Sequence, residues 1–468
     1  MASKSETVDM LNGPILPRIF LFSLPLALSG ILQLLFNAAD VIVVGKFAGS
    51  IALAAVGSTG SLINLLIGLF MGISVGVNVL VARSLGCQDN EDVHRLIHSS
   101  AALGLLLGAV VFVIGMVFSV PMLRLMDTPE DVLPLASLYL RIYFIGTPFS
   151  LLYNFLSAAL RAYGDTQRPL YFLTISGAVN VVLNLFFVIV CRLGVAGVAI
   201  ATVISQIISL VLIVVFMMRM EGCMKLRFKD LRLNGGDCMR IIQIGLPAGL
   251  QSVIFSISNV MIQSSVNSFG SSVIAANTAS GNLDGFIYNA CNSVYHAAIT
   301  FTSQNLGAQK YDRIKRVMGC SALAVTLIGV SLGSVLVIFA RPLLTIYISS
   351  TDPSYEVVLG FGLTRLKIMA TTYFTCGLME VGSGLVRGLG KTWLPMIVST
   401  FGSCVLRIVW ILTVFRWTQS LELLYLSYPI SWIITTAAHF LCFLLAFRKL
   451  QKAAIAGTRK TSEESSCP

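Results

Sequence analysis

The chain has 468 residues, of which 56% are hydrophobic and only 11% are charged. Soluble domains carry about 25% charged residues, so this composition excludes a soluble enzyme, a disordered scaffold and a secreted disulfide module. The net charge is +11, but the basic residues lie in short stretches between apolar runs rather than on one folded face, which argues against nucleic acid as a partner. The sequence therefore predicts a membrane protein that crosses the bilayer many times.

Twelve apolar segments are long enough to cross a bilayer as helices. A crossing helix needs about 20 apolar residues, and a helix satisfies its own backbone hydrogen bonds in lipid. The predicted fold class is an all-α membrane protein with twelve transmembrane helices. In chain order the predicted spans are 15–45, 51–82, 94–120, 132–160, 169–191, 194–219, 239–268, 273–304, 314–340, 355–386, 393–416 and 422–447.

The basic residues between these spans predict the orientation of the chain. With the N-terminus inside the cell, 23 lysines and arginines lie on the inner side and 8 on the outer side. Because inner loops of membrane proteins are enriched in Lys and Arg, we expect both termini to be cytoplasmic. The expected location is the cell (inner or plasma) membrane.

The chain also contains an internal repeat. Ser23-Leu24-Pro25 recurs 222 residues later as Gly245-Leu246-Pro247, and the stretch 160–166 recurs at 386–392, an offset of 226. Each half holds an even number of spans, so both halves enter the membrane from the same side. This predicts two six-helix lobes related by a pseudo-twofold axis along the membrane normal, as in many secondary transporters.

The repeat sets the predicted domain boundaries. A cytoplasmic N-terminal segment (1–14) precedes an N-lobe of six helices (15–220), and a polar, basic cytoplasmic linker (221–238) leads to the C-lobe (239–450). A cytoplasmic tail covers 451–468. Pro25 and Pro247 lie inside the first helix of each lobe, where the missing amide hydrogen permits a bend, and both are predicted hinges.

Asp40 is the clearest candidate for function in the first lobe. It lies in the first span with no basic residue nearby in sequence, and an ionisable group at membrane depth is a functional candidate by default. The alternative is an aspartate that stays hydrated near the outer interface.

Three polar residues in the fifth and sixth spans are candidates to share a site with Asp40. Asn180 and Asn184 are one helical turn apart and therefore share a face, and Thr202 offers a hydroxyl. Their oxygens, with a carboxylate, suit Na⁺ or a proton relay, so Asp40 and Asn180 form a candidate Na⁺ site. The alternative is that the two asparagines only hold neighbouring helices together.

The second lobe carries Asp284, Glu380 and Arg407 at membrane depth, and these are further site candidates. Glu380 occupies the repeat position of Asn154, so the two halves differ in chemistry there. The alternative is that Glu380 only neutralises Arg407 as a structural ion pair.

Glycines and aromatic residues complete the pattern. The stripe of Gly68, Gly72 and Gly76 and the shorter one of Gly329 and Gly333 allow close approach of helices. Gly390-Lys391-Thr392 lacks the first glycine of a phosphate-binding loop and is interpreted as a turn, so no ATP use is expected.

Aromatic residues within the spans are weak candidates to line a pocket for flat cations: Phe36, Tyr153, Phe255, Phe286, Tyr288 and Tyr373.

Over roughly residues 15 to 450 the chain resembles the multidrug and toxic compound extrusion (MATE) family. The resemblance rests on the duplicated six-helix layout, the Leu-Pro pair that opens each half, Asp40 with the Val-Gly pair that follows, and the runs at 304–309 and 387–392. It implies a two-lobe bundle that exports cationic, often aromatic compounds in exchange for Na⁺ or H⁺, with a first-lobe ion site at Asp40, Asn180 and Thr202. Asn184 stands where many members have an aspartate, and the acid of the seventh span is absent near Phe255.

The sequence thus predicts a secondary antiporter for small cationic drugs or metabolites, with H⁺ or Na⁺ as the coupling ion. We expect a monomer among membrane lipids, with no cofactor and no enzymatic activity. One alternative is a flippase for a lipid-linked precursor, which would favour several basic residues within the bundle, whereas only Arg407 lies mid-span. The other is a membrane-embedded transferase, which would need a clustered acid or histidine motif that the sequence lacks.

Overall fold

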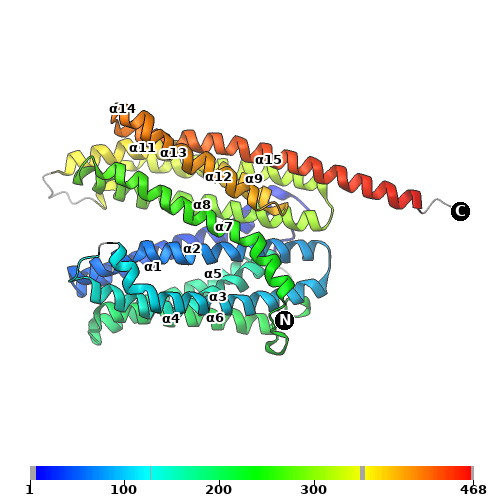
Figure 1. Cartoon of the computed structure of the whole chain (residues 1–468), viewed down its shortest axis with the longest axis horizontal. Coiled ribbons are helices and arrows are strands. Elements are labelled where there is room, and N and C mark those ends of the chain that lie inside the picture. Colours follow the sequence, from blue (N-terminus) through cyan, green and yellow to red (C-terminus); the bar gives the residue numbers. More distant parts are fainter. Residues whose placement is uncertain (1–6, 127, 348–353, 465–468) are drawn as a thin grey trace. The chain divides into compact units, whose positions relative to one another are not determined.

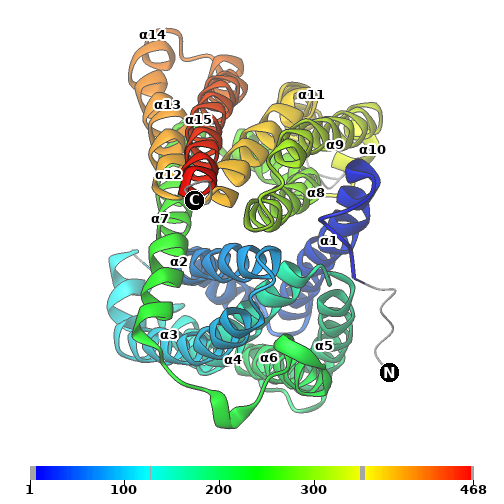
Figure 2. The same ribbon diagram turned by 90° about the vertical axis from the view of Figure 1, so that its right-hand side faces the viewer.

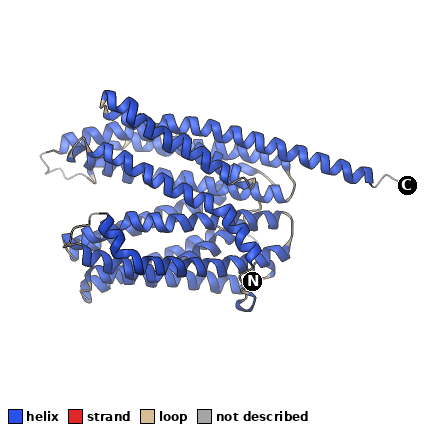
Figure 3. Cartoon of the chain, viewed as in Figure 1, coloured by secondary structure: helices blue, strands red, loops and turns tan. Residues whose placement is uncertain are grey.

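The computed structural model describes residues 7–126, 128–347 and 354–464, and this part of the chain is helical with no strand (Figure 3). Every predicted span corresponds to a helical stretch. The first half contains α1 (Ile15–Phe47), α2 (Ser50–Gly86), α3 (Asn90–Leu125), α4 (Leu133–Tyr163), α5 (Gln167–Leu185, continued by a π-helical turn over Phe186–Val190) and α6 (Gly194–Arg219).

The second half follows the same order (Figure 1). It contains α7 (Gly235–Asn267), α8 (Ser271–Gly307), α9 (Tyr311–Ile338), the short α10 (Ala340–Thr345) and α11 (Tyr355–Gly388). The next span is built from α12 (Trp393–Ser399), α13 (Leu406–Trp410) and α14 (Arg416–Thr418), which are joined by π-helical turns, and α15 (Leu421–Glu464) completes the fold.

The apolar composition of these helices suits a bilayer. Within the described residues, ten helical stretches are both long enough and apolar enough to cross a membrane. α8 and α11 are not among those ten, although they are 37 and 34 residues long. They hold the acids Asp284 and Glu380, whereas Arg407, the third charged candidate of the second half, lies in one of the ten.

The chain divides into two compact units, and the divisions fall inside helices. Unit 1 holds 1–9 and 24–253, and unit 2 holds 10–23 and 254–468. This differs from the predicted boundaries, because the linker belongs to unit 1 and the chain changes unit within α1 and within α7. The change in α1 falls between Ser23 and Leu24, directly before Pro25.

The two units are built to the same internal plan. In unit 1, α4 packs against α2, α3 and α6, and Figure 2 shows α3, α4 and α6 grouped together. In unit 2, α11 packs against α8, α9 and α15. Since α4 and α11 occupy equivalent places in the repeat, the same helix is central in each unit.

The backbone repeats this plan at its turns. Gly49 and Gly270, before α2 and α8, have φ of 91° and 93°, and Gly164 and Gly390, after α4 and α11, have φ of 98° and 82°. These left-handed angles favour glycine. Gly390-Lys391-Thr392 is therefore a turn between helices, as predicted.

Glycines bring α2 and the first half of α7 into close contact within unit 1. A Cβ on Gly72 would lie within 2.8 Å of the backbone of Ala248 and nearer still to Gly249, and a Cβ on Gly76 would lie 3.0 Å from the amide nitrogen of Gly245. The predicted close approach at Gly72 and Gly76 is confirmed, whereas Gly68 meets only an ordinary contact of 3.8 Å from Ser252.

Replacing Gly249 with alanine is expected to destabilise the protein by about 1–3 kcal/mol, because the added methyl group overlaps the backbone of Leu69 and forces α2 and α7 apart. The measurement is thermal unfolding of the purified protein in detergent. Gly57→Ala is the matched control, since nothing lies within 4 Å of a Cβ there. Equal melting temperatures for the two variants would show that the crossing tolerates the larger residue.

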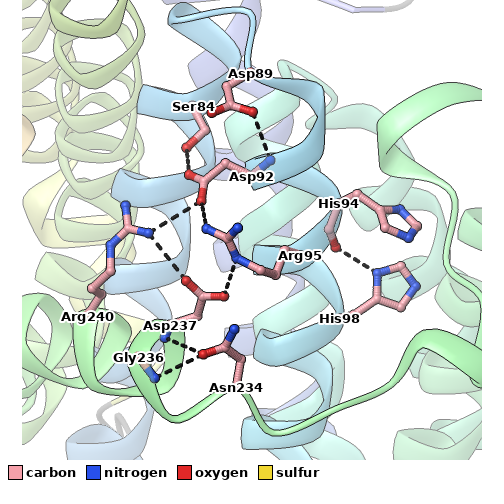
Figure 4. A network of polar contacts seen from close by, with 10 residues as sticks. All are labelled: Ser84, Asp89, Asp92, His94, Arg95, His98, Asn234, Gly236, Asp237 and Arg240. Carbon is pink, nitrogen blue, oxygen red and sulfur yellow. Dashed lines mark hydrogen bonds and ion pairs between the residues drawn. The ribbon is translucent and has the colours of Figure 1, made fainter.

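The start of α7 is held by a charged network at the ends of α2 and α3 (Figure 4). Arg95 donates to Asp237 (Nε to Oδ2, 2.7 Å) and also to Asp92, and Arg240 contacts the same two carboxylates at 3.3–3.4 Å. Asn234 caps α7 by accepting from the amide of Gly236 at 3.0 Å. The network fixes the beginning of α7 onto unit 1.

A corresponding contact holds the segment before α1 within unit 2. The carbonyl oxygen of Met10 accepts from Asn305 Nδ2 at 3.1 Å and from Arg313 Nε at 3.0 Å, and Lys310 Nζ donates to the carbonyl oxygen of Leu11 at 2.9 Å. Thus the turn between the second and third helices of each half binds the beginning of the other half's first helix.

Candidate functional site

Asp40 lies beside the two asparagines of α5. Asn184 Nδ2 donates to Asp40 Oδ1, and the same nitrogen lies 3.3 Å from Asn180 Oδ1. Asn184 is fully buried and Asn180 is 5% exposed, whereas Asp40 is half-buried. The structure therefore brings together three of the predicted first-lobe residues, from α1 and α5, in one polar cluster inside unit 1.

Asn184 Oδ1 is buried and has no hydrogen-bond partner. The amide orientation follows from its neighbours, since Nδ2 faces two oxygen acceptors. A buried acceptor without a donor is costly and calls for an explanation. The cluster thus combines a carboxylate with a buried amide oxygen that lacks a donor, a set of groups suited to a proton or a small cation.

Close packing of α1 on α5 positions this cluster. A Cβ on Gly177 would overlap the ring of Phe36, so Gly177 gives that ring its space one turn before Asn180. Phe36 is itself one turn before Asp40. The aromatic side chain that was a weak pocket candidate therefore fills the contact between the two helices and sets the register of Asp40 against Asn184.

Thr202 takes a local role in this structure. Its hydroxyl donates to the carbonyl oxygen of Val198 at 3.0 Å, within its own helix. The hydroxyl of Thr202 therefore does not donate to the cluster at Asp40.

Two tyrosines of α4 face the cluster and were missed at the sequence level. Tyr139 and Tyr143 are stacked with ring centroids 6.2 Å apart, and both interact electrostatically with Asp40. Tyr139 is buried in the same apolar cluster as Val43 and Val44 of α1. Their spacing of four residues indicates that the two tyrosines share one helix face. The sequence does not indicate that this face is turned toward Asp40.

In unit 2, Asp284 forms a buried ion pair. Arg365 Nη1 donates to Asp284 Oδ2 at 2.7 Å and to Ser280 Oγ at 2.9 Å, and the residues Asp284 and Arg365 are 4% and 8% exposed. Arg365 is one of the eight basic residues assigned to the outer side, so its role as the partner of Asp284 was not predicted. The position of Arg365, ten residues inside the predicted span 355–386, was the sequence feature that indicated a buried partner.

The suggested ion pair between Glu380 and Arg407 is not formed in the described residues. Arg407 is buried, donates through Nε to Ser431 Oγ at 2.8 Å and lies over the ring of Tyr428 at 4.3 Å. The charged group that interacts with half-buried Glu380 is Arg387, on its own helix. The explanation of Glu380 as a counterion for Arg407 was wrong, because the arginine turns toward α15.

The remaining pocket candidates occupy varied environments. Tyr153 Oη donates to the carbonyl oxygen of Pro169 at 3.0 Å, Tyr373 is buried with its ring 5.4 Å from that of Trp432, and Tyr288 is 42% exposed. Phe255 and Phe286 are half-buried. Their role as pocket lining stays a prediction.

Both predicted hinges lie within continuous helices. Pro25 lies in α1 and Pro247 in α7, and Ser29 Oγ donates to the carbonyl oxygen of Pro25 at 2.9 Å. Proline removes the helical hydrogen bond to the residue four positions earlier, so Leu21 loses its usual donor at the point where the chain changes unit.

Taken together, a duplicated helical unit with ionisable groups inside its long apolar helices defines a multi-pass membrane protein of the transporter class. The family model described as MatE matches residues 25–186 and 247–413, and the chain belongs to this family. The two matches begin at Pro25 and Pro247, which confirms the internal repeat.

Known relatives of this chain are named for multidrug resistance, transport or export. It is 29% identical over 388 residues to the Probable multidrug resistance protein YoeA of Bacillus subtilis (strain 168), covering 81% of this chain and 83% of that protein. It is 26% identical to a protein named FAD transporter from Shewanella oneidensis (75% and 78% covered) and 22% identical to Multidrug export protein MepA of Staphylococcus aureus (strain MRSA252; 81% and 83% covered).

Solved structures share the fold. One, described as the outward-facing conformation of a multidrug resistance MATE family transporter of the MOP superfamily, has a TM-score of 0.88 at 21% identity, covering 96% of this chain and all of that chain. Another, a MOP superfamily transporter from Pyrococcus furiosus described as having a binding pocket of reverse polarity, has a TM-score of 0.84 at 20% identity, covering 97% and 99%. These likenesses establish the twelve-helix fold.

Proposed function

We propose that the protein is a secondary active antiporter that exports cationic, aromatic drugs or metabolites in exchange for H⁺ or Na⁺. The observation that carries this proposal is the contact between Asp40 and Asn184, with the unsatisfied amide oxygen of Asn184 beside it. An ion bound there would neutralise the carboxylate and supply the missing partner of the amide. The relatives named for multidrug resistance and multidrug export support the export of drugs.

The coupling would act through α1. Asp40 is on the part of α1 that belongs to unit 1, whereas 15–23 belong to unit 2. A ligand shifts a conformational equilibrium only if it binds one conformation better. An ion that strengthens the contact of Asp40 with α5 would favour one conformation of α1, with Pro25 as the hinge, and alternating access would follow from that preference.

The proposed orientation places both termini in the cytoplasm of a cell whose plasma membrane holds the protein. It rests on the excess of basic residues in the inner loops. The network of Arg95, Asp237 and Arg240 and the contacts of Lys310 and Arg313 would then lie at the cytoplasmic ends of their units. We propose that the protein works as a monomer, without ATP or another cofactor.

One observation favours a second candidate substrate, an anionic aromatic compound. Arg407 is buried with its Nη2 lacking a hydrogen-bond partner, and the rings of Tyr428 and Trp432 lie 4.3 Å and 5.7 Å from its guanidinium carbon. A buried guanidinium beside aromatic faces suits a ligand that combines an acidic group with a flat ring. The name of one relative, FAD transporter, gives such a substrate for that protein.

Transport into inside-out vesicles or proteoliposomes tests the proposal. We expect an imposed H⁺ or Na⁺ gradient to drive uptake of a cationic dye such as ethidium, and a protonophore in Na⁺-free buffer to abolish uptake if the ion is H⁺. Parallel assays with FAD test the second candidate. Dye uptake that is indifferent to both gradients would exclude ion-coupled export.

A further inference from the structure

Two histidines and an aspartate meet on the face of α3 that contacts the segment between α6 and α7. His94 and His98 are one turn apart on α3, and Asp230 comes from a 3₁₀ turn (Phe228–Asp230) of that segment. One ligand atom from each residue lies within 4.8 Å of the others, and His94 Nε2 is 3.2 Å from Asp230 Oδ2. Figure 4 shows the two imidazoles side by side.

The hydrogen bonds of His98 fix which of its nitrogens carries the proton. Nδ1 lies 2.7 Å from the carbonyl oxygen of His94, which can only accept, and Nε2 accepts from the backbone amide of Arg227 at 2.9 Å. His98 is therefore neutral, with its lone pair on Nε2 directed at the segment that holds Asp230. Histidines that bind metals are oriented in the same way, by a backbone carbonyl on the other nitrogen.

The scaffold around these residues is fixed, while the side of the cluster toward water stays open. Met224 and Leu226, from the same segment, are 1% and 3% exposed in the apolar core that also contains Leu96 and Ile97 of α3. The side chains of His94 and Asp230 are 32% and 41% exposed. An ion could therefore reach His94 and Asp230 from water, whereas His98, which is 2% exposed, forms the inner side of the cluster.

We propose that His94, His98 and Asp230 form a binding site for one divalent transition-metal ion, with Zn²⁺ as the best-fitting occupant. Two imidazole nitrogens and one carboxylate oxygen are a ligand set that suits Zn²⁺, with water in the fourth position. Mg²⁺ and Ca²⁺ prefer oxygen ligands and fit poorly. The site is separate from Asp40 and from the charged network at the start of α7.

Metal binding needs small movements of the three side chains and the loss of one hydrogen bond, from the backbone amide of Arg227 to His98 Nε2. Bonds of about 2.0–2.1 Å in a tetrahedral site place ligand atoms about 3.4 Å apart, close to the 3.2 Å between His94 and Asp230. The lone pair of His98 Nε2 would then bind the ion in place of the amide of Arg227. A bound ion would join α3 to the segment that leads into α7.

Zn²⁺ binding to the full-length protein, purified in detergent with its affinity tag removed, tests the site. A chromophoric Zn²⁺ indicator competes with the protein, and the titration gives stoichiometry and affinity. We expect one Zn²⁺ per chain, no displacement by excess Mg²⁺, and affinity lowered at least 10-fold by His94→Ala and by Asp230→Asn, since even the loss of second-shell groups costs about 10–100-fold. Both substitutions change partly exposed side chains and leave the buried His98 in place.

The control is Glu221→Gln, which makes the same carboxylate-to-amide change at an exposed position of the same segment. It is expected to bind Zn²⁺ as tightly as the unaltered protein. Fewer than one bound Zn²⁺ per two chains in the unaltered protein, or binding that His94→Ala and Asp230→Asn leave unchanged, would overturn the proposal. Neither result depends on transport, so the antiporter proposal stands or falls separately.

Discussion

Replacing Asp40 with asparagine is expected to reduce ion-driven transport strongly while leaving the protein folded. The amide keeps the size of the side chain and can still contact Asn184, so the packing of α1 on α5 is retained. It can neither exchange a proton nor neutralise a cation. Coupling between two ligands is typically worth about 5–150-fold in affinity, so we expect gradient-driven dye uptake to fall at least about 10-fold.

The measurement is uptake into proteoliposomes at matched protein density, with and without the gradient. Asp131→Asn, at an exposed position between α3 and α4, is the matched control and is expected to transport normally. Asp40→Glu keeps the carboxyl group and is expected to retain part of the coupling. Uptake by Asp40→Asn at the level of the unaltered protein would show that the carboxyl group has no role in coupling.

A substitution of Asn184 distinguishes an ion-binding role of this residue from a purely structural one. Asn184→Ala removes the hydrogen bond to Asp40 and the orphaned oxygen together. If the cluster binds the ion, transport should need a higher ion concentration for half-maximal rate, whereas a purely structural asparagine should lower the melting temperature and leave that concentration unchanged. The two readouts decide between the interpretations that the sequence left open.

The helices and the repeat could be predicted because they follow from local features. Apolar length sets a span, and a turn that needs left-handed glycine leaves a mark such as Gly164 and, 226 residues later, Gly390. The cluster at Asp40 was predictable in part, because Asn180 and Asn184 share a helix face by spacing alone. The alignment of that face with Asp40 depends on the fit of Phe36 over Gly177, which spacing does not specify.

Contacts between distant helices escaped prediction for the same reason. Arg365 is 81 residues from Asp284, so their pairing depends on how two separate helices pack. Asp230 is 136 residues from His94 and lies in an irregular segment whose path depends on the burial of Met224 and Leu226. Such pairings depend on the rotation of each helix about its axis, which a single sequence constrains weakly.

Breaking the pair of Asp284 and Arg365 is expected to cause the largest loss of stability in unit 2. Arg365→Met leaves the carboxylate of Asp284 buried without its partner, with Oδ1 already lacking a hydrogen bond. Removing one partner of a buried ion pair costs about 3–5 kcal/mol. We expect a marked fall in the melting temperature of the purified protein in detergent, and Asp284→Leu should have a similar effect by leaving the arginine unpaired.

The double variant Asp284→Leu with Arg365→Met distinguishes a structural pair from a functional one. Because apolar replacement of a whole buried pair is often neutral, we expect the double variant to regain most of the stability that each single variant loses, which is a non-additive result. Additive losses would mean that the two side chains are not coupled. If the double variant is stable and transports, Asp284 has a structural role. If it is stable and inactive, the pair takes part in the transport cycle. Asp284 would then be a second charged group of that cycle, beside Asp40.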